Sequence, residues 1–308
     1  MRHLRIGTRG SALALWQANH VRDLLIKSHG VEVELVRIRT SGDYLQTASV
    51  AQIGTIGVFT KELEEALLSG TVDLAVHSMK DVPTDTSPGL AFPAITKRED
   101  VRDCLITHDT RKLSDLPAGA RVGTSSLRRQ AQLRHHRHDL EFVDLRGNVD
   151  TRLAKVAAGE VDAVVLALAG VTRLGAADKV TEILPIDAML PAVGQGALGI
   201  ETRASDRDTW KFISVLNDPE ARSCVRAERS LLRELQGGCQ VPLGAWARIE
   251  EGEMVMEAGV FSPDGKEFVR RELRGVPDDP LALGRRLGQI LIEAGADRIL
   301  RLAGRSVG

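Results

Sequence analysis

The segment Gly70-Thr71-Val72-Asp73-Leu74-Ala75-Val76 decides the fold, because its pattern returns as Gly159-Glu160-Val161-Asp162-Ala163-Val164-Val165. A second pattern, Arg5-Ile6-Gly7-Thr8, returns as Arg121-Val122-Gly123-Thr124, and each copy leads into a helical pattern. Units that recur in the same order predict two similar lobes. Short α/β units also resemble one another by chance, and that alternative stays open on the sequence alone.

The first lobe alternates strand and helix patterns. Strands are expected at 4–8, 31–39 and 72–76, with one helix starting at the N-cap candidate Ser11 and another over 60–69. This order predicts a mostly parallel sheet with helices on its faces. Ligands of such sheets bind beyond the carboxyl ends of the strands, so two facing lobes predict a cleft there.

The chain has two candidate crossings between the lobes, a polar run at 97–100 and a glycine-rich stretch at 191–200. Two crossings predict a hinge. A long helix pattern, three strand patterns and a closing helix then predict a smaller α+β domain. The expected α/β architecture is therefore lobe 1 over residues 1–96 and 197–217, lobe 2 over 97–196, and a third domain over 218–308.

Composition limits the classes of partner. The 308 residues hold 41 Lys and Arg against 42 Asp and Glu, a net charge of −1, so no global field favours nucleic acid or an anionic membrane. No apolar run approaches the roughly 18 residues of a membrane span, and the start of the chain lacks a signal-peptide pattern. We expect a cytoplasmic protein with neither a nucleic-acid nor a membrane partner.

The cysteines, Cys104, Cys224 and Cys239, are odd in number and lack C-x-x-C spacing, which argues against a disulfide framework and a metal site. Cys104 and Cys224 lie in strand and helix patterns, where a cysteine is typically a small buried hydrophobe. Cys239 instead follows Gly237-Gly238 and precedes Pro242, which predicts a thiol presented on a sharply turned loop. No His-Asp partner set is evident, so a protease-like dyad is not favoured.

Arginines follow predicted strand ends in both lobes. Arg9 follows the first strand, and the second lobe adds Arg128, Arg129, Arg146, Arg152 and Arg173. Guanidinium groups bind carboxylates bidentately, helix N-termini offer N–H groups, and the hydroxyls of Thr124, Ser125 and Ser126 add short donors. A single arginine is more often a solvated surface charge. The shared placement in both lobes favours a cleft that binds a polyanion.

The segment His77-Ser78-Met79-Lys80-Asp81-Val82-Pro83 follows the third predicted strand. A Lys-Asp pair at a strand end suits acid–base chemistry or stabilisation of a cation, although a loop salt bridge is an equally good reading. The equivalent place in the second lobe, Leu168-Ala169-Gly170, has no charge. If the lobes are duplicates, the chemistry therefore belongs to the first lobe.

Six dispersed motifs now identify a known family. The chain resembles the porphobilinogen deaminase (hydroxymethylbilane synthase) family in RIGTRGSALALWQA from Arg5, HSMKDVPT from His77, GTSSLRRQAQL from Gly123, LRGNVDTRL from Leu145, LPAVGQGALGIE from Leu190 and LQGGCQVPLGA from Leu235. The resemblance covers nearly the whole chain, and the motifs occur in the family's order.

The resemblance implies two lobes of periplasmic-binding-protein type, with a hinge cleft, plus a third domain that carries the cofactor cysteine. It implies one dipyrromethane cofactor per chain, attached through a thioether to Cys239. The free α-carbon of this primer attacks the methylene of deaminated porphobilinogen, four additions follow, and water releases hydroxymethylbilane. The family implies a monomeric, cytoplasmic transferase of heme and porphyrin biosynthesis.

The resemblance also implies roles for individual residues. The expected catalytic residues are Asp81 and Arg9, because a carboxylate would stabilise the cation left by ammonia loss and accept the α-proton. Cofactor contacts are expected from Ser78, Lys80, Asp81, Thr124, Ser125, Ser126, Arg128, Arg129, Arg146 and Gly147. Substrate contacts are expected from Arg9, Ser11, Arg146, Arg152, Arg173 and Gln195.

The chain departs from the family in one loop, where Gln52 and Ile56 stand at positions that hold lysines in many members. Roles of those lysines cannot be transferred, and we expect a less basic lid with weaker substrate binding.

Two other classes of protein explain less of the sequence. A non-enzymatic pair of lobes that binds a small anion leaves the Gly-Gly-Cys loop unexplained, and a cysteine acyl-transferase lacks a base beside the sulfur.

Overall fold

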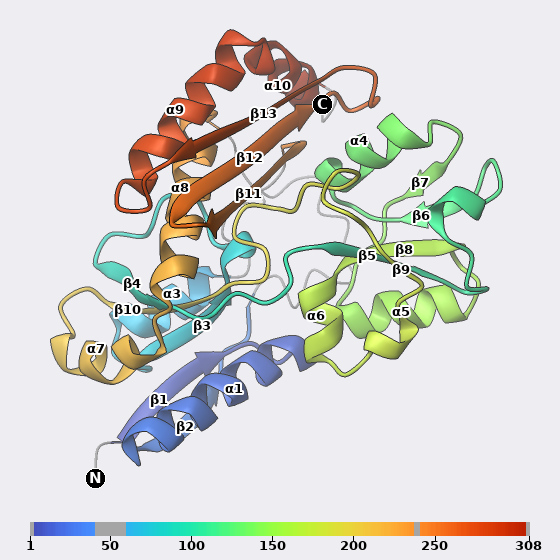
Figure 1. The fold of residues 1–308 in the computed structure, drawn as a ribbon. Coiled ribbons are helices and arrows are strands. Elements are labelled where there is room, and N and C mark those ends of the chain that lie inside the picture. The colour runs from blue at the N-terminus through green and yellow to red at the C-terminus, as the bar shows by residue number, and fades with distance from the viewer. Residues whose placement is uncertain (1–2, 41–59, 237–240, 306–308) are drawn as a thin grey trace. The chain divides into compact units, whose positions relative to one another are not determined.

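The computed structural model describes residues 3–40, 60–236 and 241–305 (Figure 1). The chain divides into two compact units. The first unit comprises Met1–Arg98 and Ala197–Arg222, and the second comprises Glu99–Gly196 and Ser223–Gly308. Each unit is described by itself.

The first unit is built on a five-stranded sheet with the order β2-β1-β3-β10-β4. Its strands are β1 (His3–Thr8), β2 (Glu32–Arg37), β3 (Leu74–Ser78), β4 (Leu90–Ile95) and β10 (Leu198–Arg203). β1 runs parallel to β2 and β3, whereas β10 is antiparallel to β3 and β4. The helices are α1 (Ala12–His29), α3 (Lys61–Leu68), α7 (Arg207–Ile213) and the 3-10 turns η1 (Met79–Asp81) and η4 (Ser214–Leu216).

Helix α1 shows how the sequence positions the edge of this sheet. Ser11 is its N-cap, as predicted, and the Ser11 side chain accepts a hydrogen bond from the backbone N–H of Ala14. The helix ends at Gly30, whose φ of 61° is a left-handed C-cap. Val21 and Leu25 are fully buried in the same core cluster as the β1 residue Ile6. The start of α1 is thereby fixed beyond the carboxyl end of β1.

The second unit contains a five-stranded sheet with the order β7-β6-β8-β5-β9. Its strands are β5 (Asp103–Thr107), β6 (Arg121–Gly123), β7 (Glu141–Val143), β8 (Ala163–Ala167) and β9 (Glu182–Ile183). The helices around this sheet are α4 (Leu127–His136), α5 (Val149–Ala157), α6 (Leu168–Arg173), and the turns η2 (Leu113–Asp115) and η3 (Ala177–Lys179). β6 is parallel to β7 and β8, and β5 is antiparallel to β8 and β9. The two sheets correspond strand for strand, which confirms the prediction of two similar lobes.

The repeated sequence motif forms the same clamp in each lobe. The Arg5 backbone N–H donates to Asp73 Oδ2 at 2.9 Å, and the Asp73 backbone N–H donates to the Arg5 carbonyl at 2.9 Å. In lobe 2, the Arg121 backbone N–H donates to Asp162 Oδ2 at 2.7 Å, and the Asp162 backbone N–H donates to the Arg121 carbonyl at 2.9 Å. The backbone hydrogen bond from Arg121 lowers the pKa of Asp162. The motif thus joins β1 to β3 in the first lobe and β6 to β8 in the second.

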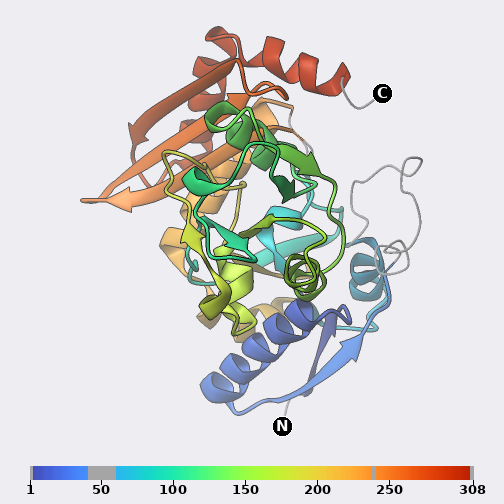
Figure 2. The ribbon, with the colours of Figure 1, turned by 90° about the vertical axis from the view of Figure 1, so that its right-hand side faces the viewer.

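A three-stranded antiparallel sheet, β11-β12-β13, forms the remainder of the second unit. Its elements are β11 (Leu243–Glu250), β12 (Glu253–Phe261), β13 (Phe268–Gly275), α8 (Pro219–Glu234), α9 (Pro280–Glu293) and α10 (Ala296–Arg305). Figures 1 and 2 show α9 and α10 beside this sheet, and one core cluster unites residues of all three helices and strands. This is the α+β arrangement expected for the C-terminal part.

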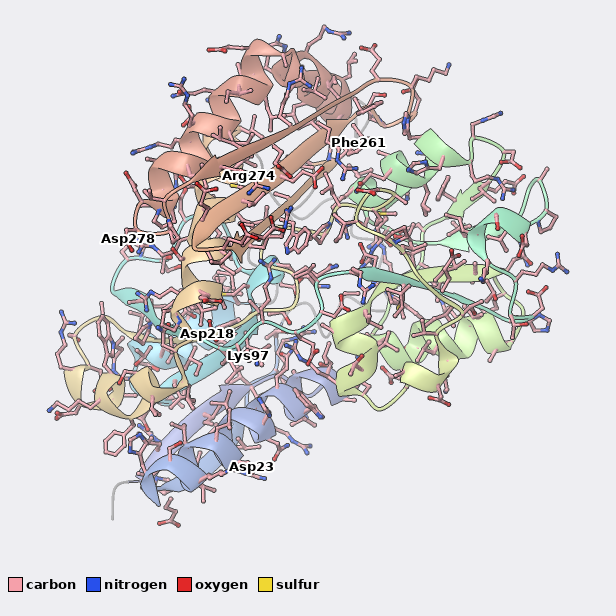
Figure 3. The ribbon with its side chains drawn as sticks, in the orientation of Figure 1. Asp23, Lys97, Asp218, Phe261, Arg274 and Asp278 are labelled. Carbon is pink, nitrogen blue, oxygen red and sulfur yellow. The ribbon has the colours of Figure 1, made fainter. Side chains whose placement is uncertain are left out.

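The sequence Asp218-Pro219-Glu220 predicts the start of a long helix, with Asp218 as N-cap, and α8 confirms it. Asp218 lies at the start of α8 (Figure 3). The Ala221 N–H donates to Asp218 Oδ1 at 2.8 Å, and Pro219 is the first helical residue. The first turn of α8 belongs to the first unit and the rest of the helix to the second. Among the helices that the structure describes, none has both the length and the apolar character needed to cross a bilayer.

Several elements differ from the sequence prediction. β2 is shorter than the expected 31–39, and β3 begins at Leu74 rather than at residue 72, because Asp73 is used in the clamp with Arg5. The sequence also predicts a strand over 164–169, but β8 ends at Ala167 and α6 begins at Leu168. Helix α10 was not predicted, since Gly295, with a φ of 95°, interrupts the helical pattern before it.

The contact between α8 and α9 gives a first prediction. A Cβ added at Gly284 would lie 2.2 Å from the carbonyl oxygen of Ala227 and 2.8 Å from Ser230 Cβ. We expect Gly284→Ala to lower the free energy of unfolding by about 1–3 kcal/mol, because the helices must move apart. Urea denaturation measures this, with Gln289→Ala on the exposed side of α9 as the control. An unchanged midpoint for Gly284→Ala would contradict the close contact.

Candidate functional site

The first unit brings five predicted site residues to one edge of its sheet. β1 and β3 are parallel neighbours, so their carboxyl ends lie side by side. Arg9 and Ser11 follow β1, while Ser78 ends β3 and η1 carries Lys80 and Asp81. Arg9, Ser11 and Lys80 are half-buried and Asp81 is exposed. The edge therefore presents a carboxylate next to cationic side chains.

The segment before Asp81 is held from two sides. Gln17 on α1 is 4% exposed, and its Nε2 donates to Ser78 Oγ at 2.8 Å. The Met79 N–H donates to the Ala197 carbonyl at 3.0 Å. Sequence reasoning missed Gln17, although a polar residue beside Ala18 on the apolar face of α1 is a signal for such a contact.

A buried pair of ionisable side chains lies next to this segment. His77 Nε2 is 2.9 Å from Glu201 Oε2, and the two side chains are 5% and 2% exposed. The distance is within the range of an ion pair, but the atoms are not aligned for a hydrogen bond. The ring of Phe92 meets His77 edge-on at 5.9 Å. Sequence analysis assigned no role to either member of the pair.

In the second unit, three predicted site residues converge on a carboxylate that sequence analysis did not single out. Asp103 is fully buried, and Arg128 Nη1 and Arg129 Nη2 each donate to it at 2.7 Å. Gln195 Nε2 also donates to Asp103, at 3.1 Å. Burial alone would raise the pKa of Asp103, but the charges and hydrogen bonds of Arg128 and Arg129 hold it well below its usual range. The carboxylate is therefore ionised and orients both guanidinium groups.

The hydroxyl groups of Thr124, Ser125 and Ser126 lie at the start of α4. Ser126 is the N-cap, and its side chain accepts a hydrogen bond from the Arg129 N–H. Thr124 is fully buried and its Oγ1 accepts from the Ser126 N–H at 3.2 Å. Ser125 is exposed and donates to the Leu145 carbonyl at 3.1 Å. These contacts fix the conformation of a helix N-terminus, which suits an anion.

The next strand of this lobe, β7, is followed by Arg146, Gly147 and Arg152. Arg146 is exposed, and its Nε lies 3.0 Å from Asp144 Oδ2. Gly147 has a φ of 109°, and its carbonyl accepts from Arg152 Nε at 2.9 Å. Because β6 and β7 are parallel neighbours, this turn lies on the same edge as the start of α4.

Two predicted substrate contacts are more deeply buried than the others. Arg173 is 9% exposed and donates to the Gly196 carbonyl at 2.7 Å, and burial lowers the pKa of its guanidinium. Gln195 is 1% exposed and also donates to the Val101 carbonyl at 2.7 Å. Both side chains thus bind backbone of the two crossing segments.

Several predictions concern residues outside the described part of the chain. These are Gln52, Ile56 and Cys239, with the glycines before Cys239. The other two cysteines, Cys104 and Cys224, are buried, as predicted, and burial raises the pKa of the Cys104 thiol to about 12. Such a thiol is a poor nucleophile.

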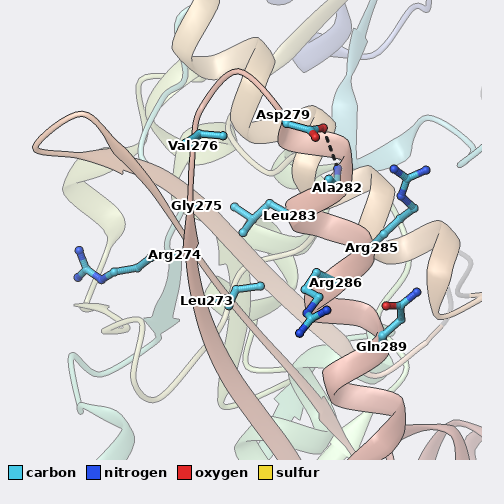
Figure 4. A pocket seen from close by; sticks show the side chains of 10 residues that line it. All are labelled: Leu273, Arg274, Gly275, Val276, Asp279, Ala282, Leu283, Arg285, Arg286 and Gln289. Atoms are coloured by element: carbon cyan, nitrogen blue, oxygen red, sulfur yellow. Dashed lines mark hydrogen bonds between the residues drawn. The ribbon is translucent and has the colours of Figure 1, made fainter.

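The second unit has a pocket between β13 and α9 (Figure 4). Its cavity volume is about 460 Å³, and Leu273 and Leu283 contribute apolar walls. The Asp279 side chain caps α9 by accepting from the Ala282 N–H at 3.2 Å. No predicted site residue lines this pocket.

Within the described ranges, no cluster of three or more His, Cys, Asp or Glu side chains could hold a metal ion.

The motifs and both lobe edges can now be compared with known proteins. The family profile described as "Porphobilinogen deaminase, dipyromethane cofactor binding domain" matches residues 4–211. The chain belongs to the porphobilinogen deaminase family. The profile of the porphobilinogen deaminase C-terminal domain matches residues 222–293. The family resemblance seen in the six motifs is confirmed, and with it a transferase with a dipyrromethane cofactor.

Relatives within the porphobilinogen deaminase family match nearly the whole chain. The porphobilinogen deaminase of Pelobacter propionicus is 50% identical over 307 residues, covering 99% of this chain and 96% of that protein. The one from Syntrophotalea carbinolica is 50% identical over 298 residues, covering 96% and 95%. A crystal structure of the methionine-binding protein MetQ has a TM-score of 0.46 at 14% identity, covering 70% of this chain and 89% of MetQ. The fold assignment is based on the strand orders and not on this low score.

Proposed function

We propose that this chain deaminates porphobilinogen and joins four molecules head to tail on a cysteine-linked dipyrromethane primer, then releases hydroxymethylbilane by hydrolysis. The observation that supports the chemistry is the exposed carboxylate of Asp81, fixed on η1 beside the end of β1. Family membership supports the reaction class. We propose the same three-part division as above, with lobe 1 over 1–96 and 197–217, lobe 2 over 97–196 and the third domain over 218–308.

The donor set fits the proposed cofactor. A dipyrromethane carries acetate and propionate arms, and carboxylates suit the hydroxyls, helix N-terminus and guanidinium groups at the lobe 2 edge. We assign its binding to Ser78, Lys80, Asp81, Thr124, Ser125, Ser126, Arg128, Arg129, Arg146 and Gly147, with Cys239 as the attachment point. When bound, the group supplies the nucleophilic pyrrole carbon that primes chain growth.

Asp81 has two tasks in this proposal. Its negative charge stabilises the cation that porphobilinogen becomes when ammonia leaves. The same carboxylate then accepts the proton lost from the coupled carbon. Arg9, at the same sheet edge, anchors a substrate carboxylate and is a candidate proton donor.

Substrate carboxylates are assigned to the remaining polar residues of the two edges. They are Arg9, Ser11, Arg146, Arg152, Arg173 and Gln195. Each arginine offers the planar fork that a carboxylate matches. We further propose that the enzyme is a cytoplasmic monomer without a nucleic-acid or membrane partner, in keeping with a net charge of −1.

The attachment of the primer gives the second prediction. Intact-mass spectrometry of the purified protein should show an increment of two linked pyrrole units, and Cys239→Ser should lack it and be inactive. Cys224→Ser, a change at a buried cysteine on α8, is the control and should keep the increment. An active wild-type protein of unmodified mass would overturn the proposed primer mechanism.

A further inference from the structure

The buried pair His77–Glu201 has no place in the mechanism above. Both side chains are at most 5% exposed, and their facing atoms are 2.9 Å apart. Removing two ionisable groups from water is costly, and an apolar pair of similar volume is often equally stable or more stable. Stability therefore does not account for an ionisable pair at this position.

The residues of lobe 2 that match His77 and Glu201 show whether the sheet itself needs ionisable side chains at these two positions. Ile6 pairs with Leu74 in lobe 1, and Val122 pairs with Ala163 in lobe 2, so residues of β3 and β8 can be matched one by one. By this register His77 corresponds to Leu166.

The partner strand gives the same alignment. Glu201 lies opposite Ala75, and Ile106 lies opposite the matching residue, Val164. Leu166 and Ile106 are 3% and 4% exposed. Lobe 2 thus fills the two positions with a buried apolar pair, and the topology does not need ionisable groups there.

The pair also lies where β3 meets η1, the 3-10 turn that carries Asp81. His77 is the penultimate residue of β3, and Ser78 and η1 follow it directly. Next to the pair, Gly199 leaves room for Met79, because a Cβ on Gly199 would lie 2.2 Å from Met79 Sδ. In lobe 2, the residue that corresponds to Asp81 is Gly170, which has no side chain to position.

We propose that His77 and Glu201 are positioning residues for Asp81. The pair fixes the end of β3 against β10, and together with the Gln17–Ser78 hydrogen bond it sets the direction in which η1 leaves the sheet. The two residues touch neither substrate nor cofactor and act through the Asp81 carboxylate. This inference rests on the proposed role of Asp81.

The apolar pair of lobe 2 supplies the test, the double variant His77→Leu/Glu201→Ile in the holoenzyme. We expect the thermal unfolding midpoint to stay the same or rise. We expect kcat to fall by about 10-fold to 100-fold, the effect of a small misplacement of a reacting group, with KM for porphobilinogen nearly unchanged. Ile106→Val, at the matching lobe 2 position, is the control and should keep the ordinary kcat.

A double-mutant cycle separates positioning from a general structural role. In an Asp81→Asn background, measured by single turnover, the double variant should cause no further loss, because the pair acts only through Asp81. An ordinary kcat in the double variant, or an undiminished extra loss in the Asp81→Asn background, would overturn the inference. If the double variant does not fold, Glu201→Gln is taken through the same cycle. Full activity of Asp81→Asn alone would instead overturn the proposed role of Asp81.

Discussion

Asp81→Asn should fold normally and lose turnover by at least about 100-fold, the loss typical for a positioned acid–base or charge-stabilising group. Asparagine keeps the shape of the side chain but removes the charge proposed to stabilise the cation, and its amide oxygen is too weak a base to accept the proton. Asp81 is exposed, so the substitution leaves no cavity and buries no unpaired group. The rate of porphobilinogen consumption measures the effect, and circular dichroism checks the fold.

The matched control for this prediction is Asp85→Asn. Asp85 is also exposed and lies in the same connection, between β3 and β4. If the effect depends on Asp81 itself, this variant should keep turnover within a few-fold of wild type. Equal losses in both variants would mean that the net charge of the connection matters, and full activity in Asp81→Asn would exclude Asp81 from the chemistry.

The repeated motifs explain why so much of the fold could be predicted. Arg5 and Asp73 each belong to a short sequence pattern that recurs in lobe 2, and the copies, Arg121 and Asp162, make the same hydrogen bonds. Periodicity likewise located the helices that begin at Ser11 and Asp218, because each cap lies beside the pattern it starts. Such local signals are available in a sequence.

The residues that contact the predicted site residues could not be predicted from such local patterns. Arg128 and Arg129 were identified from their position at a helix start, but their common carboxylate, Asp103, is the first residue of β5 and comes from a distant part of the sequence. Glu201 was hidden for the same reason, since β10 pairs with a strand from a distant part of the sequence. Strand register decides both contacts, and the sequence does not state register across a crossing.

The two lobes share one topology but place a buried carboxylate at different positions in it. By the same register, Asp103 of lobe 2 corresponds to Leu198 of lobe 1, and Glu201 of lobe 1 corresponds to Ile106 of lobe 2. Each lobe therefore has one buried carboxylate on the fourth strand of its sheet, β10 or β5, but at different positions. In lobe 1 the carboxylate lies beside the segment that carries Asp81, and in lobe 2 it binds two guanidinium groups. On the proposed assignments, the acid–base chemistry belongs to lobe 1, and lobe 2 supplies arginines for carboxylates.

The buried group of lobe 2 leads to the prediction with the largest effect on stability. Asp103→Ala should lower the free energy of unfolding by about 3–5 kcal/mol, because it leaves Arg128 and Arg129 buried without their counter-charge. Urea denaturation measures this. The control is Asp208→Ala, which breaks an exposed pair with Lys211 and should cost at most about 1 kcal/mol.

The pH dependence distinguishes the lost charge from lost packing. The pKa of Asp103 is lowered in the folded protein, so its stabilising contribution is fully present above the unfolded value of about 3.9. The contribution declines as pH falls below that value and is lost only when pH passes the folded pKa. Asp103→Asn nearly conserves volume, yet it should lose stability at pH 7 and show a shallower decline below about pH 4 than wild type. Parallel acid limbs in the two proteins would show that Asp103 carries no stabilising charge and that Arg128 and Arg129 are held by packing alone.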